Sequence, residues 1–137
     1  MADRGATEEL LVRLFDEFWN DRKLQRIGDV FASDAVIHFG PTDFSGHGGI
    51  RDDFAGPFMD AFPDLRHEIL MMLIDGDRAA ARYRGTGHMR KDYGGARGSG
   101  QAFEYHGIAI FRIAGGRIAE VWSNSDMAVW LAAQPRA

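Results

Sequence analysis

Asp126 occupies the joint between the last predicted strand and a closing helix, where a carboxylate could cap the helix or transfer protons. As a cap it would directly precede Met127, a preferred position for aspartate. As a general acid/base it would need a carbon acid nearby and a donor that stabilises the enolate oxygen. Tyr105 and Asn124 could donate that hydrogen bond, and Trp122 would reduce the hydration of the carboxylate and raise its pKa. The residues alone leave both roles of Asp126 open.

Two alternating apolar runs, at 101–113 and 117–125, predict the hairpin that would bring these side chains together. If Gly115-Gly116 forms a two-residue turn, Ala114 pairs with Arg117. Counting outward from that pair then places Tyr105 opposite Asp126. Side chains on one face of the predicted hairpin are then Tyr105, Trp122, Asn124 and Asp126. The opposite face carries Ile108, Ile110, Arg112, Val121 and Ser123, together with His106.

Amphipathic helices are predicted to cover one face of this sheet. Apolar residues from position 7 to about 23 recur at helical spacing, and their stripe includes Phe15 and Trp19. A short helix over 24–31 follows, and a third over 50–62 should be kinked or split in two by Gly56-Pro57. Further strands are predicted over 35–39, 65–74 and 78–88, with a mobile loop over 91–100. Helices before and after an antiparallel sheet indicate the α+β class, with the sheet curved around the N-terminal helices.

A hydrophobic pocket is expected near the open end of this sheet, because helices cannot completely fill a strongly bent sheet. The residues predicted to contact a small apolar molecule there are Asn124, Trp122, Tyr105, His38, Phe15 and Trp19. The opposite face carries more apolar side chains than the helices can cover, for example Met71, Leu73 and Ile110. We therefore expect a homodimer through the sheet face.

Composition limits the other partners and the location of the chain. With 137 residues and 45% hydrophobic residues, a single domain over 1–137 with one core is expected. The net charge of -4 gives no general attraction to nucleic acid or to a membrane. A cytoplasmic location is expected, because there is no cysteine, no apolar leader and no run of ~18 apolar residues. The five histidines lack ligand spacing and no phosphate or dinucleotide loop occurs, so neither a metal nor a cofactor is expected.

Five segments, by their order and spacing, resemble those of the SnoaL-like polyketide cyclases. They are Gly-His-Gly-Gly-Ile at 46–50, Phe-Pro-Asp at 62–64, Gly-Thr-Gly-His at 85–88, the strand 107–112, and 116–122 followed by Asp126. The likeness runs from about residue 10 to 131, and it implies the cone-shaped α+β fold of the nuclear transport factor 2-like superfamily. In such cyclases a carboxylate after the Glu-x-Trp segment moves a proton during aldol ring closure. The resemblance assigns that role to Asp126, with Asn124 as its polar partner.

The resemblance implies cofactor-independent cyclisation or isomerisation of a small, apolar carbonyl compound. A non-catalytic ligand-binding or dimerisation module of the same fold is an alternative, since one fold serves many functions. An epoxide hydrolase-like enzyme is a second alternative, and it would need an Asp-Arg-Asp cluster that activates water. The segment 96–100 departs from the Pro-Pro-Thr-Gly usual in the family, so the sequence predicts no particular substrate.

Overall fold

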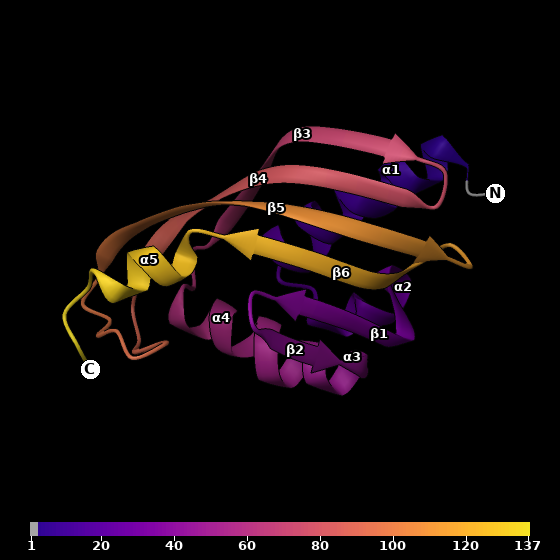
Figure 1. The fold of residues 1–137 in the computed structure, drawn as a ribbon. Helices are drawn as coiled ribbons and strands as arrows, with labels where there is room; N and C mark the ends of the chain where they lie inside the picture. Colours follow the sequence, from indigo (N-terminus) through magenta and orange to yellow (C-terminus); the bar gives the residue numbers. More distant parts are fainter. Residues whose placement is uncertain (1–2) are drawn as a thin grey trace.

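The computed structural model describes residues 3–137 as a curved, open sheet of six strands wrapped around helices (Figure 1). The strands are β1 (Phe31–Phe39), β2 (Thr42–Ser45), β3 (Arg66–Asp75), β4 (Arg78–Met89), β5 (Gln101–Ala114) and β6 (Arg117–Ser125). They lie in the order β2-β1-β6-β5-β4-β3. Four of the neighbouring pairs are antiparallel, and β1 runs parallel to β6. The predicted α+β class is confirmed, but the sheet is mixed and contains the unpredicted short strand β2.

The helical segments supply the apolar side chains that the concave face of the sheet encloses. They are α1 (Arg4–Arg13), η1 (Leu14–Asn20), η2 (Leu24–Arg26), α2 (Ile27–Val30), α3 (Gly46–Gly48), η3 (Gly49–Ala55), α4 (Gly56–Ala61) and α5 (Met127–Ala132). The first helix begins earlier than predicted, because Asp3 caps it and accepts a hydrogen bond from the Gly5 amide. The predicted short helix ends at Val30, and Phe31 already belongs to β1.

The helix predicted over 50–62 continues through Gly56-Pro57 instead of splitting there. Its first part, η3, has π-helical turns, and Pro57 lies in the first turn of α4, directly after the change from π-helical to α-helical turns. Gly56 allows the chain to pack closely at this transition, since a Cβ atom there would lie 2.7 Å from the Arg51 carbonyl oxygen.

The segment 91–100, predicted to be a mobile loop, is tied to the C-terminal residues. Ala96 is buried and forms bridges with Tyr93 and Arg136. The Arg97 amide donates a hydrogen bond of 2.8 Å to the Pro135 carbonyl. Backbone pairing with the tail therefore fixes a segment whose glycines alone suggested mobility.

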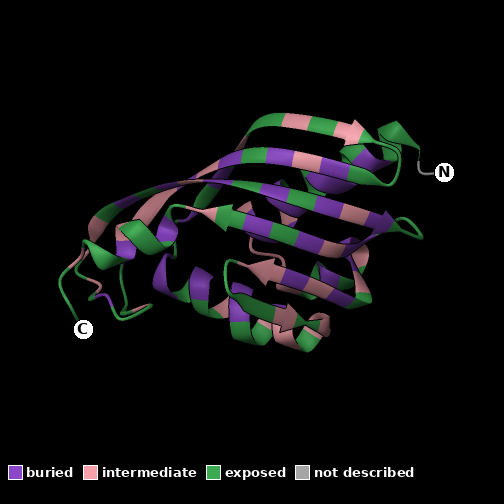
Figure 2. Ribbon diagram, in the orientation of Figure 1, coloured by how far each residue is buried: buried purple, intermediate pink, exposed green. Residues whose placement is uncertain are grey.

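The faces of β6 are shifted by one residue from the prediction, whereas those of β5 agree with it. Buried and exposed residues alternate along both strands (Figure 2). Ala109 pairs with Ser123 and Ile110 pairs with Trp122, so the predicted pairing of Tyr105 with Asp126 is wrong. The reason is a bulge: the pairing shifts between Ile113–Ile118 and Arg112–Glu120, and Ala119 is the extra residue. Val121 and Ser123 therefore face the core, while Trp122 and Asn124 face outward.

Candidate active site

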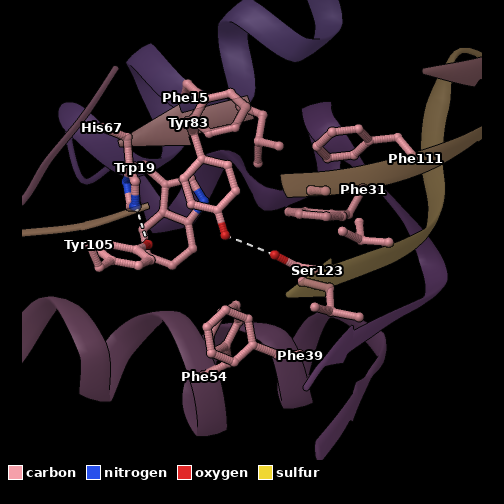
Figure 3. A pocket seen from close by; sticks show the side chains of 14 residues that line it. Phe15, Trp19, Phe31, Phe39, Phe54, His67, Tyr83, Tyr105, Phe111 and Ser123 are labelled. Carbon is pink, nitrogen blue, oxygen red and sulfur yellow. Dashed lines mark hydrogen bonds between the residues drawn. The ribbon is translucent and has the colours of Figure 1, made fainter. Parts of the chain in front are cut away.

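A cavity of about 50 Å³ lies between the N-terminal helices and the concave face of the sheet (Figure 3). Its lining comes from helices and strands that are far apart in sequence. The lining residues are Leu14, Phe15, Trp19, Phe31, Ile37, Phe39, Phe54, His67, Tyr83, Tyr105, Ala109, Phe111, Val121 and Ser123. Across residues 3–137, no aspartate, glutamate, lysine or arginine lines this cavity. Its polar groups are therefore one imidazole, two phenols, one hydroxyl and the indole N–H of Trp19, among apolar walls.

His67 on β3 and Tyr105 on β5 form the first polar pair in the cavity. The distance between His67 Nε2 and the Tyr105 hydroxyl is 2.5 Å, and both side chains are buried. Asn20, at the end of η1, fixes the backbone of His67 with two hydrogen bonds. Its side-chain oxygen accepts from the His67 amide (2.6 Å), and its side-chain nitrogen donates to the His67 carbonyl (2.9 Å). The C-terminal end of η1 thus fixes the backbone that carries the imidazole.

Tyr83 on β4 and Ser123 on β6 form the second polar pair. Their hydroxyl groups lie 2.8 Å apart, and both side chains are buried. Figure 3 shows the two polar pairs side by side within the apolar lining. The ring centroids of Tyr83 and Tyr105 are 5.8 Å apart, and the rings meet edge to face. Two phenol hydroxyls, each with its own polar partner, are therefore brought into one small cavity.

Burial keeps all of these groups neutral at neutral pH. Loss of hydration, with a smaller effect of the Arg22 charge, lowers the pKa of His67 to about 3. His67 Nδ1 is also buried and has no hydrogen-bond partner among the described residues, so an added proton there would be unsatisfied. Burial likewise raises the pKa of Tyr83 and, more strongly, that of Tyr105. The cavity therefore offers hydrogen bonds but no fixed charge.

The lowered pKa of His67 predicts a loss of stability in acid. Unfolded His67 would take up a proton as the pH falls below about 6.5, whereas folded His67 stays neutral until about pH 3. The unfolded state then binds more protons, so the free energy of unfolding should fall by about 1.4 kcal/mol per pH unit in that window. Above pH ~6.5 His67 should contribute no slope. Urea unfolding of wild type and His67→Gln between pH 7.5 and 4.5 measures the difference, and parallel curves would contradict it.

Asp126 lies outside the cavity lining, at the end of β6. Its carboxylate accepts a hydrogen bond of 2.8 Å from the His106 amide, while its own amide donates to the His106 carbonyl. The side chain therefore extends the ladder between β5 and β6 by one hydrogen bond. It makes no capping bond to α5, where the Ser125 hydroxyl accepts from the Met127 amide instead. Asp126 thus occupies the N-cap position of α5, as predicted, but its side chain does not cap the helix, and 56% of that side chain is exposed.

Three other predicted contact residues lie on the outer face of the sheet. The side chains of Trp122 and Asn124 are exposed because the bulge at Ala119 reverses their direction. His38 also lies outside the cavity lining and stacks on the Trp122 ring at 5.8 Å. Its ring nitrogens contact carboxylates of Glu120 (2.6 Å) and Asp43 (2.8 Å), and these hydrogen bonds raise the pKa of His38. Of the predicted contact residues, Phe15, Trp19 and Tyr105 line the cavity.

His67, Tyr83 and Ser123 were not recognised as site residues from the sequence. The predicted register placed Glu120 opposite Phe111 on the core face, where an unpaired carboxylate is costly. A bulge near Ile118-Ala119 would have removed that conflict and turned Ser123 inward. His67 is the first buried position in the alternating run of β3, and that alternation could have identified it as a core histidine.

Within the described residues, 3–137, no group of three or more histidine, cysteine or acidic residues is arranged to hold a metal ion. In that same part of the chain, no helix combines the length and apolar character needed to cross a membrane.

The curved sheet around N-terminal helices, with a small cavity between them, defines the cone-shaped class of nuclear transport factor 2-like folds. A profile of the family described as SnoaL-like polyketide cyclase matches residues 9–134, and the chain belongs to that family. Among solved structures it is similar to a SnoaL-like protein from Jannaschia sp. CCS1, with a TM-score of 0.85 and 22% identity over 98% of this chain and 100% of that chain. It is also similar to wild-type IdmH from Streptomyces antibioticus, with a TM-score of 0.78 and 25% identity over 91% and 95% of the two chains. No curated protein matches the chain.

Proposed function

We propose that this protein catalyses cofactor-independent cyclisation or isomerisation of a small, apolar carbonyl compound. The observation that carries the proposal is the small, mainly apolar cavity with its two buried polar pairs, His67–Tyr105 and Tyr83–Ser123. Neutral phenols in a site with few water molecules are strong partners for an oxygen on which negative charge develops. Family membership supports the reaction class, and IdmH is itself described as a candidate polyketide cyclase.

In this proposal, the phenol of Tyr105 or Tyr83 donates a hydrogen bond to the carbonyl oxygen of the substrate. Proton removal from the adjacent carbon then gives an enolate, whose negative oxygen the phenol stabilises. His67 is too weak a base for this step, because its pKa is lowered to about 3. We assign the acid/base role to Asp126, which lies near enough for its charge to add to the effect of burial on the pKa of both tyrosines. Because Asp126 is exposed and does not line the cavity, this step requires the carbon next to the carbonyl to lie within reach of its carboxylate.

The size of the cavity limits what can enter it. A cavity of roughly 150 Å³ can hold a benzene ring, and this cavity is about 50 Å³. A compound of polyketide size would therefore insert only its carbonyl-bearing end, or side chains would have to move. Substrates with one apolar, oxygen-bearing end are expected to bind best. Ligands that carry a charge at that end are disfavoured, because burial of an unpaired charge is costly.

A non-catalytic ligand-binding module is the second candidate. The observation in its favour is that Asp126, the proposed base, is exposed and already bonded to the His106 amide. In that case Tyr83 and Tyr105 would bind a carbonyl group without turnover. An epoxide hydrolase-like reaction has less support, because neither aspartate nor arginine occurs in the lining formed by the described residues.

A thermal-shift screen of polyketide-like and steroid-like compounds tests the proposal, since a ligand that binds only the folded state raises Tm. Compounds that raise Tm are then assayed for turnover with wild type and with Asp126→Asn. Turnover that needs Asp126 supports the enzyme. Binding without turnover would leave the binding module, and the absence of any ligand that carries a carbonyl would contradict both candidates.

We also propose that two copies of the chain associate through the outer face of the sheet. Six large apolar side chains are exposed there, namely Leu70, Met71, Leu73, Ile108, Ile110 and Trp122. Strand pairing places Ile110 between Ala80 and Trp122 in the middle of this surface. Such an apolar area is more typical of an interface than of a free surface. A homodimer would remove it from water.

Light scattering after size exclusion tests the dimer. Wild type should have twice the mass of the 15.2 kDa chain, and Ile110→Glu should have the mass of one chain. The control is Val129→Glu, because Val129 is 73% exposed but lies on α5, away from the sheet face. The control should remain dimeric. A monomeric wild type would contradict the proposal.

A further inference from the structure

A Tyr-x-Gly sequence occurs on each of the two neighbouring strands that carry the phenols, β4 and β5. It is Tyr83-Arg84-Gly85 on β4 and Tyr105-His106-Gly107 on β5. The strands are antiparallel, and their register pairs Tyr83 with Gly107 and Gly85 with Tyr105. All four residues are on the core face, where Tyr83 is 5% exposed and Tyr105 is 2% exposed. Each tyrosine is therefore paired with the glycine of the other repeat, on the neighbouring strand.

The space above each glycine is occupied by the opposite tyrosine ring. A Cβ atom built at Gly107 would lie 2.5 Å from Tyr83 Cζ and would be closer still to the Tyr83 hydroxyl oxygen. A Cβ atom built at Gly85 would lie 2.8 Å from Tyr105 Cδ1, and another ring atom would be closer. These separations are shorter than real Cβ contacts, so any side chain at either position would displace a ring. A methyl group at position 107 would push Tyr83 away from Ser123, to which its hydroxyl is bonded at 2.8 Å.

Backbone conformation does not explain these two glycines. Neither Gly85 nor Gly107 has a positive φ angle, whereas glycines in the turns, such as Gly76 and Gly115, do. Glycine within a strand weakens the strand and often marks a place where another group approaches closely. A ring packed over a cross-strand glycine is a known way to restore the lost contacts. At both positions the absence of a side chain leaves room for the ring of the tyrosine on the neighbouring strand.

We propose that Gly85 and Gly107 are positioning residues, and that the interlocked Tyr-x-Gly repeats fix the two phenol hydroxyls that receive the carbonyl oxygen of the substrate. The identity of the ligand in this inference rests on the proposed function, whereas the packing of the two rings over the two glycines does not depend on it. The repeats set the ring positions, and the partners His67 and Ser123 set the direction of each hydroxyl. The site would therefore be built mainly by two rigid strands, which suits precise placement of hydrogen-bond donors.

The test compares Gly107→Ala with wild type, using protein labelled with ¹³C at the Cζ atoms of tyrosine. The Cζ resonance of Tyr83, assigned with Tyr83→Phe, should move in Gly107→Ala, and Tm should fall by roughly 5 to 10 °C because the core is overpacked. Binding of butanone and of 2-methylbut-1-ene, two molecules of similar shape, is then measured by NMR titration. Gly107→Ala should weaken butanone binding about tenfold and alkene binding by less than about threefold, because only the ketone accepts a hydrogen bond.

A second variant separates the role in positioning from a general need for glycine. In the background of Tyr83→Ala, Gly107→Ala should no longer lower Tm, because the ring that it displaces is absent. Gly48→Ala is the matched control, since a Cβ atom at Gly48 meets nothing within 4 Å. An unchanged Tyr83 resonance, or an equal loss of Tm in both backgrounds, would overturn the proposal. If the resonance moves but wild type binds ketone and alkene equally, the interlock holds and the proposed carbonyl site fails.

Discussion

Tyr105→Phe should lower the free energy of unfolding by about 1–3 kcal/mol and reduce turnover by about 10²–10³-fold. The stability loss follows because His67 Nε2, now 2.5 Å from the Tyr105 hydroxyl, would be buried without a partner. The loss of turnover follows because a donor to the developing enolate would be missing. Urea unfolding measures the first effect. Steady-state kinetics on a ligand found by the thermal-shift screen measures the second.

Tyr93→Phe is the matched control for Tyr105→Phe. Tyr93 stacks on Phe58 with ring centroids 5.7 Å apart, but it does not line the cavity. Removing its hydroxyl should change neither stability nor turnover by a comparable amount. If Tyr105→Phe behaves like Tyr93→Phe, the His67–Tyr105 pair contributes neither the stability nor the turnover that we predict.

Asp126→Asn should reduce turnover by about 10²–10⁴-fold while the protein remains folded. Asparagine keeps a side-chain oxygen that can accept the hydrogen bond from the His106 amide, now 2.8 Å long. The substitution therefore removes the negative charge and the basic oxygen but retains the link between β5 and β6. Turnover and Tm are measured on the same preparation, so that a catalytic defect is separated from unfolding.

Glu104→Gln is the control for Asp126→Asn. Glu104 is an exposed carboxylate on the outer face of β5, the strand that also carries His106. It lies 3.6 Å from the His106 imidazole. Its neutralisation should leave turnover unchanged. Full turnover in Asp126→Asn would show that Asp126 only extends the strand ladder. The assignment of the acid/base to this residue would then be withdrawn.

Much of the fold could be predicted because apolar periodicity reports directly on burial. The stripe that contains Phe15 and Trp19 identified the first helix, and the alternating runs identified β3 to β6. The short edge strand β2 was missed, since its exposed sequence has no alternation to detect. The parallel pairing of β1 with β6 was also missed, because a strand of nine residues carries no sequence signal for the direction of its neighbour.

The candidate site was harder to predict than the fold because it depends on register. One extra residue, Ala119, reverses the faces of Trp122 and Ser123, and side-chain direction alternates with every residue. Tyr105 was placed correctly because β5 has no bulge on its pairing with β4. His67 could not be paired with Tyr105 from sequence, since their contact joins β3 to β5 across the intervening β4. Contacts of that kind follow only from the curvature of the whole sheet.

A crystal structure of the complex with the ligand that raises Tm most would show directly whether the two phenols bind a carbonyl group. We expect the ligand's carbonyl oxygen to lie in the cavity, roughly 2.6–3.2 Å from the hydroxyl of Tyr83 or Tyr105. A ligand bound on the outer face beside Trp122, or held in the cavity with its oxygen turned away from both phenols, would contradict it.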